Sequence, residues 1–350
     1  MSFIATTDIH LTDNPDHAYR WRIFDFLKQR AKEHRRNGDV PKLIIAGDMT
    51  ENKSGHSARL VNDFAQQIAT ASEYFAHIYL MRGNHDYKPG EGSFFHFLRW
   101  IRHVTWADDI YWASNFAPEQ RSKSIVLAPH GVDFADVRRK CALENPNFLF
   151  CHATFNGAKA ANGFALDGES LKELRGIKAR IFSGDIHTRQ KLGPVEYIGT
   201  PYPIDFDEDH SCRVIEISDT GKVTSVPTDI IRKHTLTCSN KKELHKRLSE
   251  TRPGDQVKVR WHMSTADLSH ASSLYTQIVD ACSDAQVLLT GGVEYLFDEK
   301  TGPHVLAFHG EKGSREAQHT TAQIFDAFVK VRRLRGPLIK TGRKIVGGGK

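Results

Sequence analysis

The chain has 350 residues, of which 39% are hydrophobic and 26% charged, and its formal net charge is +6. This composition is that of a folded protein with one large domain and a smaller one, and it excludes a chain that is disordered over most of its length. The opening MSFIATTDIH has no basic segment followed by an apolar one, and no run of about 18 apolar residues occurs. We therefore expect neither secretion nor membrane insertion.

The first two hundred residues alternate short apolar runs with helix-like stretches. Runs with the length and residue types of strands fall at 3–6, 42–47, 77–83, 124–129, 148–152 and 179–184. Helical apolar spacing occurs at 17–36, 57–75 and 134–144, and shorter β-like segments follow at 195–199, 212–218 and 222–227. This order predicts an α/β core of layered sheets flanked by helices.

Beyond about Asp229 the pattern becomes that of a small α+β domain. The strand-like segments KHTLTCS, DQVKVRWHMS and QVLLT alternate with the helix-like KKELHKRLSE and SSLYTQIVDACS. The following DEKTGPHVLAFHGEKGSRE is polar and loop-like, whereas TAQIFDAFVKVRRLRG has helical spacing. We predict a main domain at 1–229, a capping domain at 230–300, and a linker, helix and basic tail at 301–350.

The positive charge is concentrated in that tail. Residues 330–350 include eight basic side chains and no acidic one, so the rest of the chain has 40 basic against 42 acidic residues. Such a run attracts phosphate backbones or an acidic partner surface, and a solubilising extension is the alternative. The basic residues are Lys330, Arg332, Arg333, Arg335, Lys340, Arg343, Lys344 and Lys350.

Side chains that can bind metals follow the apolar runs, where strands would end. They are Asp8 and His10 in TTDIH, Asp48 in AGDMTE, Asn84, His85 and Asp86 in RGNHDY, His152 in FCHAT, and Asp185 and His187 in SGDIH. Open α/β sheets collect their sites at the carboxyl ends of strands. Carboxylate, amide oxygen and imidazole together suit divalent ions such as manganese, with iron and zinc as alternatives. The five cysteines are isolated and are expected to be free thiols in a reducing cytoplasm.

The order Asp-x-His, Gly-Asp, Gly-Asn-His-Asp, His, Gly-x-x-His resembles that of the calcineurin-like metallophosphoesterase superfamily. The segments HATFNGAKAANGFALDG and GPVEYIGTPYPIDFDED resemble those of the SbcD-type (Mre-type) DNA nuclease subunits, particularly phage versions. The resemblance covers roughly residues 1–230 by motifs and the capping domain only by its pattern. It implies a layered β-sandwich nuclease domain, two metal ions, an SbcC-like ATPase partner and a homodimer in a bacterial or phage-infected cell.

The resemblance also implies roles for single residues. The first ion would be held by Asp8, His10 and His187 and the second by Asn84, His152 and Asp185, with Asp48 bridging them. A carboxylate suits the bridging position because its two oxygens can reach two ions about 3.5–4 Å apart. His85 is left without a ligand role and is expected to act as a general acid toward the departing sugar oxygen. Asp86 either orients His85 or is a plain surface acid.

Two positions depart from the family pattern. The last motif is usually Gly-His-x-His, whereas this chain reads GDIH, so Asp185 stands where an imidazole is expected. Because aspartate is a good manganese ligand, we expect the two-metal site to remain intact. The second departure is GDMTE, where nuclease relatives often carry aromatic and histidine residues, and it leaves open how substrate is handled near Glu51.

The sequence thus predicts a manganese-dependent DNA exonuclease, with single-strand endonuclease activity in addition. The alternatives are a phosphatase or small phosphodiesterase on the same metal site, and a DNA-end scaffold that no longer catalyses. Helical spacing of apolar residues in the tail favours docking onto the ATPase partner over DNA binding. The aromatic residues of FFHFLRW are expected to pack in a core and not to stack on bases. Isolated histidines, His130 among them, are expected to be surface or core residues.

Overall fold

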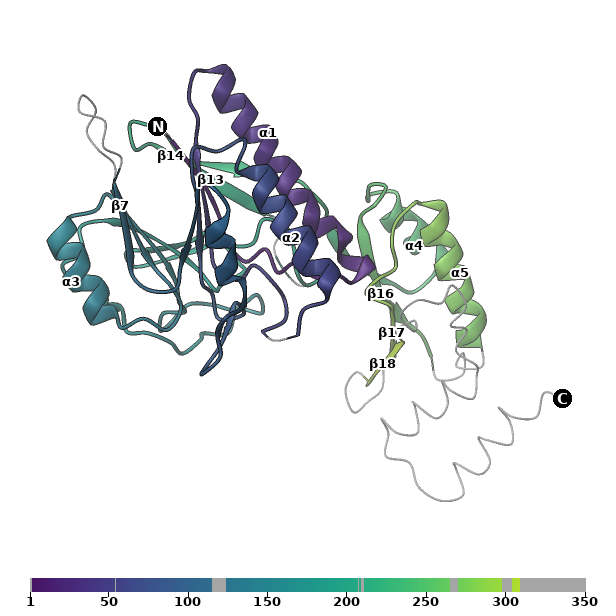
Figure 1. Cartoon of the computed structure of the whole chain (residues 1–350). Coiled ribbons are helices and arrows are strands. Elements are labelled where there is room, and N and C mark those ends of the chain that lie inside the picture. Colours follow the sequence, from purple (N-terminus) through teal and green to yellow (C-terminus); the bar gives the residue numbers. More distant parts are fainter. Residues whose placement is uncertain are drawn as a thin grey trace. The chain divides into compact units, whose positions relative to one another are not determined.

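The structure is a computed structural model that describes residues 2–53, 55–114, 124–206, 208, 211–264, 270–297 and 304–308. The chain divides into two compact units, residues 1–230 and 231–350 (Figure 1). The predicted tail helix and the basic residues from Lys330 onward lie outside the described residues. Within the described ranges, no helix has both the length and the apolar character needed to cross a membrane.

The first unit is built on two six-stranded sheets. One sheet has the order β14-β13-β1-β2-β3-β6 and the other the order β11-β12-β10-β9-β8-β7. The strands of the first sheet are β1 (Phe3–Thr6), β2 (Lys42–Ala46), β3 (Ile78–Met81), β6 (Val104–Ala107), β13 (Arg213–Ile217) and β14 (Val223–Pro227). Those of the second sheet are β7 (Tyr111–Ser114), β8 (Ser124–Ala128), β9 (Phe148–His152), β10 (Arg180–Gly184), β11 (Gln190–Leu192) and β12 (Val195–Tyr197). A separate hairpin pairs β4 (Tyr87–Lys88) with β5 (Gly92–Ser93).

The inner faces of the two sheets pack against each other. Their common core joins Ile44 and Tyr79 of the first sheet to Phe150 and Phe182 of the second. The rings of Phe150 and Phe182 stack with their centroids 5.4 Å apart. The central strands β2, β3 and β9 are buried along almost their whole length. Strands covered on both faces read as continuous apolar runs, which is the pattern that the sequence displays.

Helices cover the outer faces of this sandwich (Figure 1). They are η1 (Pro15–Trp21), α1 (Arg22–Arg36), α2 (Ala58–Ala71), η2 (Phe94–Trp100), α3 (Phe134–Glu144) and η3 (Leu171–Leu174). Helices α1 and α2 meet through the rings of Phe24 and Phe64. Helix α3 lies on the other side, where Phe134 and Val137 pack on the second sheet. The predicted α/β class is therefore confirmed.

In the second unit, the residues that the structure describes form a sheet of order β15-β16-β17-β18 and two helices. Its elements are β15 (Lys233–Cys238), α4 (Lys241–Leu248), β16 (Gln256–His262), α5 (Ala271–Asp284), β17 (Val293–Phe297) and β18 (His304–Phe308). The first three strands are parallel and β18 is antiparallel. Helix α4 is capped at its N-terminus, because Asn240 accepts a hydrogen bond from the Glu243 amide, and Glu243 accepts one from the amide of Ser239, the residue before the cap.

Some local predictions were wrong. The stretch 17–36 is not one α-helix, because a 3-10 segment capped by Asn14 precedes α1. The segment QVLLT forms only an isolated bridge, through Leu288, and the third strand of that sheet is β17. The segment expected to be a loop contains strand β18. Its five residues pair with β17 although polar residues flank them. In η2, Phe95 is buried, but Phe94 and Trp100 are 50% and 79% exposed.

Candidate metal centre

The motif residues follow neighbouring parallel strands. Strands β1, β2 and β3 run parallel in the first sheet, as do β9 and β10 in the second. Asp8 and His10 follow β1, Asp48 follows β2, Asn84 and His85 follow β3, His152 ends β9, and Asp185 and His187 follow β10. Parallel strands carry their carboxyl ends at the same edge of a sheet, which accounts for the convergence of residues so distant in sequence.

The backbone of four of these residues is left-handed, which is rare for residues other than glycine. The φ angles are 52° at Asp8, 40° at His10, 52° at Asp48 and 78° at Asp185. Main-chain hydrogen bonds hold the first three in this conformation, since the amides of Asp8 and His10 donate to the carbonyls of Gly47 and Asp48 at 3.0 Å. Strained backbone of this kind is characteristic of functional sites whose surroundings fix the conformation.

Two motif glycines make room for the side chains of the centre. A Cβ atom on Gly47 would lie 2.2 Å from His152 Nδ1, and φ at Gly47 is +97°. A Cβ atom on Gly83 would lie 2.2 Å from Asp48 Oδ1. Real Cβ contacts are never this short, so the two loops can approach each other only with glycine at these positions.

Carboxylate and imidazole atoms converge in overlapping groups. Asp8, His10 and His187 form one group and Asp8, Asp48 and His152 form another, and the ligand atoms within each group lie within 4.8 Å of one another. The Nε2 atoms of His10 and His187 are 3.2 Å apart. Except for His187, these side chains are buried. Asp8 belongs to both groups, whereas the sequence assigns it to the first ion alone, and the division of the ligands between two ions stays a prediction.

Asp48 lies between the two groups. Its Oδ2 is 3.5 Å from His10 Nε2, and its Oδ1 is 3.3 Å from His152 Nε2. Each oxygen of one carboxylate thus faces an imidazole of a different group. This is the geometry that a carboxylate shared between two ions requires.

Asn84 and Asp185 lie on the His152 side. Asn84 Oδ1 is 3.3 Å from His152 Nε2, and Asp185 Oδ1 is 3.8 Å from the same nitrogen. The other oxygen of Asp185 accepts a hydrogen bond of 2.5 Å from the hydroxyl of Thr154. The unusual aspartate of the GDIH motif therefore has an oriented carboxylate with one oxygen directed at the centre.

The buried carboxylates shift the pKa values of the histidines around them. Burial, together with the charge of Asp48, raises the pKa of Asp8 to about 6 against the effect of His152. Burial acts to lower the pKa of His187, but the hydrogen bond with Glu208 and the charge of Asp8 outweigh it, and the pKa rises to about 9. The pKa of His152 is likewise raised because Asp48 outweighs burial. Both upward shifts reflect the negative charge of the carboxylates around these imidazoles.

These residues fit divalent cations. His10 Nδ1 is buried without a hydrogen-bond partner. Burial lowers the pKa of His10 to about 3, so its ring is neutral and offers a lone pair, the form in which imidazole binds metals. Bound cations would balance the negative charge of the buried carboxylates. Carboxylate, imidazole and amide oxygen together are ligands suited to manganese, iron or zinc.

His85 lies beside the centre with one nitrogen engaged. Its Nδ1 donates a hydrogen bond of 2.5 Å to the carbonyl of Glu51, and its ring meets that of His10 edge to face at 4.9 Å. A carbonyl oxygen only accepts, so Nδ1 carries a hydrogen and Nε2 remains to exchange a proton. His85 also forms a ligand-like group with His10 and Asp48, within 4.8 Å. The geometry is thus compatible with a general acid and with a third imidazole ligand.

Asp86 is neither a surface acid nor hydrogen-bonded to His85. It is 2% exposed, and its two oxygens accept hydrogen bonds of 2.8 Å from the amides of Met49 and Gly83. These amides belong to the loops after β2 and β3. Asp86 therefore ties together the loops that carry Asp48 and Asn84. The alternative of a plain surface acid is wrong because the side chain is buried, and the orienting of His85 stays a prediction.

Several supporting residues were not found from the sequence. Buried Arg20 donates to the carbonyl of His10 and, at 2.6 Å, to the carboxylate of Glu51. Glu208 accepts from His187 Nδ1 at 2.6 Å, the kind of contact that orients a metal-binding imidazole. Arg20 belongs to none of the motifs, and Glu208 lies in the segment GPVEYIGTPYPIDFDED but was not singled out there. The ring of His130, expected to be unrelated to the site, has its centroid 6.3 Å from that of His152.

A sequence model of the calcineurin-like phosphoesterase family matches residues 1–189. No curated protein matches the chain. The matched range begins before Asp8 and ends after His187, so it includes every residue of the centre. It ends before the second unit begins.

Proposed function

Because the chain belongs to the calcineurin-like phosphoesterase family, and is therefore a metal-dependent hydrolase of phosphoesters, we propose that its substrate is the phosphodiester backbone of DNA. In this proposal it is a two-metal exonuclease that also cuts single strands internally. The observation that supports the two-metal chemistry best is Asp48, with one oxygen toward His10 and the other toward His152.

In this proposal each residue of the centre either holds an ion or donates a proton. Asp8, His10 and His187 would hold one ion, and Asn84, His152 and Asp185 the other, with Asp48 shared. Bound divalent ions supply Lewis acidity toward the phosphoryl oxygens. His85, whose Nδ1 is fixed by the Glu51 carbonyl, presents Nε2 to the departing sugar oxygen and donates a proton to it.

DNA as substrate is supported by sequence features outside the centre. The segments after the fourth and fifth motifs resemble those of SbcD-type nuclease subunits, and the chain ends in a run of eight basic residues. A polyanion is drawn to such a run. A phosphatase of small molecules needs neither this run nor an added capping domain, so the second candidate has less support.

Metal content and nuclease activity of the purified chain test the proposal together. We expect about two manganese ions per chain after loading, and cleavage of linear DNA that stops when a chelator removes them. Cleavage of p-nitrophenyl phosphate without cleavage of DNA would instead support the phosphatase. Metal binding with no hydrolysis of either substrate would support the scaffold.

We further propose that the chain works with an SbcC-like ATPase and that the apolar positions of the tail segment, Ile324, Phe325 and Phe328 among them, contact this partner. Deleting residues 321–350, which removes these apolar positions together with the basic residues, is then expected to abolish co-purification with the ATPase while DNA cleavage continues with the same salt dependence. If the tail binds DNA instead, the slope of log affinity against log salt falls by about 0.9 for each duplex phosphate that the shortened chain no longer binds. No change in either measurement contradicts both roles.

A further inference from the structure

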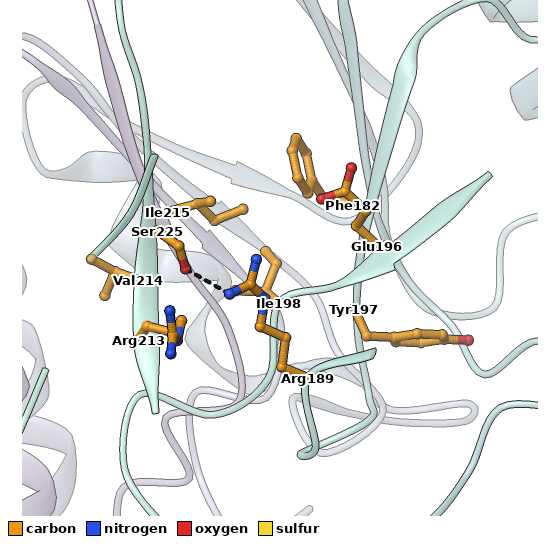
Figure 2. A pocket seen from close by; sticks show the side chains of 9 residues that line it. All are labelled: Phe182, Arg189, Glu196, Tyr197, Ile198, Arg213, Val214, Ile215 and Ser225. Carbon is orange, nitrogen blue, oxygen red and sulfur yellow. Dashed lines mark hydrogen bonds between the residues drawn. The ribbon is translucent and has the colours of Figure 1, made fainter. Parts of the chain in front are cut away.

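Two small hollows share part of their lining. The first is lined by His187, Arg189 and Ile198 among others. The second is also lined by Arg189 and Ile198, and by Arg213 and Ser225 (Figure 2). Arg189 therefore borders both the hollow that is lined by a predicted metal ligand and the hollow that is lined by a second arginine.

The two arginines come from different walls of the second hollow, Arg189 from the loop after β10 and Arg213 from the start of β13 (Figure 2). Arg189 Nη1 donates to Ser225 Oγ at 2.9 Å, and Arg213 Nε donates to the carbonyl of Ser211 at 2.9 Å. Among the residues that the structure describes, neither guanidinium forms an ion pair. Each has five N–H donors, so most of them remain available to a ligand.

The one carboxylate that lines the second hollow does not cancel this charge. Glu196 accepts hydrogen bonds of 2.8 and 2.9 Å from Arg180, which lies outside the lining. Its charge is thus offset by a third arginine, and the two lining guanidinium groups remain in excess. Paired guanidinium groups with a neighbouring hydroxyl suit a phosphate group, because their N–H donors match its oxygens.

Both arginines lie on chain segments that adjoin the segments of the metal centre. Arg189 follows His187 by two residues, so their Cα atoms are at most about 7 Å apart. Strand β13 pairs antiparallel with β1, with Ile215 opposite Ala5. Arg213, two residues earlier, is therefore level with Thr7, the residue before Asp8. Both arginines thus come from chain segments next to the predicted metal ligands.

We propose that Arg189 and Arg213, with Ser225, bind a phosphodiester group adjacent to the one that is cleaved. The enzyme would then hold two phosphates of one nucleic-acid strand at once. This inference rests on the proposed function as a DNA phosphodiesterase. It adds a reason why a strand with several phosphates is preferred to a substrate with one.

The test compares two substrates in Arg189→Gln and Arg213→Gln. One is a single-stranded oligonucleotide and the other is bis(p-nitrophenyl) phosphate, which has one phosphodiester. We expect the ratio of kcat/KM for the oligonucleotide to kcat/KM for the small substrate to fall at least about tenfold in each variant, because a charge-assisted hydrogen bond to the strand is removed. The salt dependence of oligonucleotide binding should also weaken, by about 0.7 in log–log slope for each phosphate that the variant no longer binds.

Arg139→Gln is the matched control, because this arginine is 80% exposed on α3 and takes no part in the hollows. An unchanged ratio in both test variants overturns the inference. If the ratio of the two kcat/KM values stays constant but inorganic phosphate inhibits the variants less, the site binds a free anion. This result also overturns the strand-binding role. If the unaltered chain cleaves only the small substrate, the proposed DNA function fails, and this site fails with it.

Discussion

Replacing His85 by asparagine is expected to lower the turnover of DNA about 100-fold to 10,000-fold while metal content stays near that of the unaltered chain. The reason is that His85 is proposed to donate a proton to the departing oxygen and not to hold an ion. Asparagine removes the titratable ring and keeps a polar side chain of similar reach. Steady-state kinetics and metal analysis of the same preparation check this result.

The alternative role of His85 gives a different outcome. Its ring belongs to a ligand-like group with His10 and Asp48, so loss of one ion together with turnover would show that His85 is a ligand. His96→Asn is a suitable control, because this histidine is exposed and pairs with Asp108 away from the centre. It should change neither quantity.

Asp185→Asn should weaken the second ion and reduce DNA hydrolysis by about two orders of magnitude or more, since a neutral amide replaces an anionic ligand. Asp185→His should retain substantial activity with manganese, because it restores the imidazole that the family usually has at this position. Titration of manganese against activity for the two variants measures the difference.

The hydrogen bond from Thr154 explains why this aspartate can serve as a ligand, since the hydroxyl holds one oxygen and leaves the other toward His152. Full activity in Asp185→Asn would exclude Asp185 from the ligand set. Asp136→Asn removes a comparable charge from the exposed side of α3 and should leave manganese dependence as it is.

The positions of the centre could be predicted because they depend on strand ends. A buried parallel strand is a continuous apolar run, and the residue after it lies at the edge where ligands gather. Asp8, Asp48 and Asp185 were found in this way. Arg20 and Glu208 could not be found, because their contacts with His10 and His187 depend on chain folding between elements and follow no spacing rule.

The fold was predictable to a similar degree. Long apolar runs predicted the central strands. Strand β18 was not predicted, because five residues between polar flanks are too few to show a strand pattern. The role of Asp86 was also hidden, since it depends on two amides that approach its carboxylate from different loops. Local patterns identify elements, whereas hydrogen bonds between loops become visible only in three dimensions.

The left-handed turns after β1 and β2 have a thermodynamic consequence. Amides of Asp8 and His10 are already bonded to carbonyls of the neighbouring loop, so the conformational entropy of these residues is lost when the chain folds and not when a cation arrives. Cation binding then carries no further cost for ordering the backbone of these two residues. The centre differs in this respect from small zinc domains, in which metal binding and folding are one event.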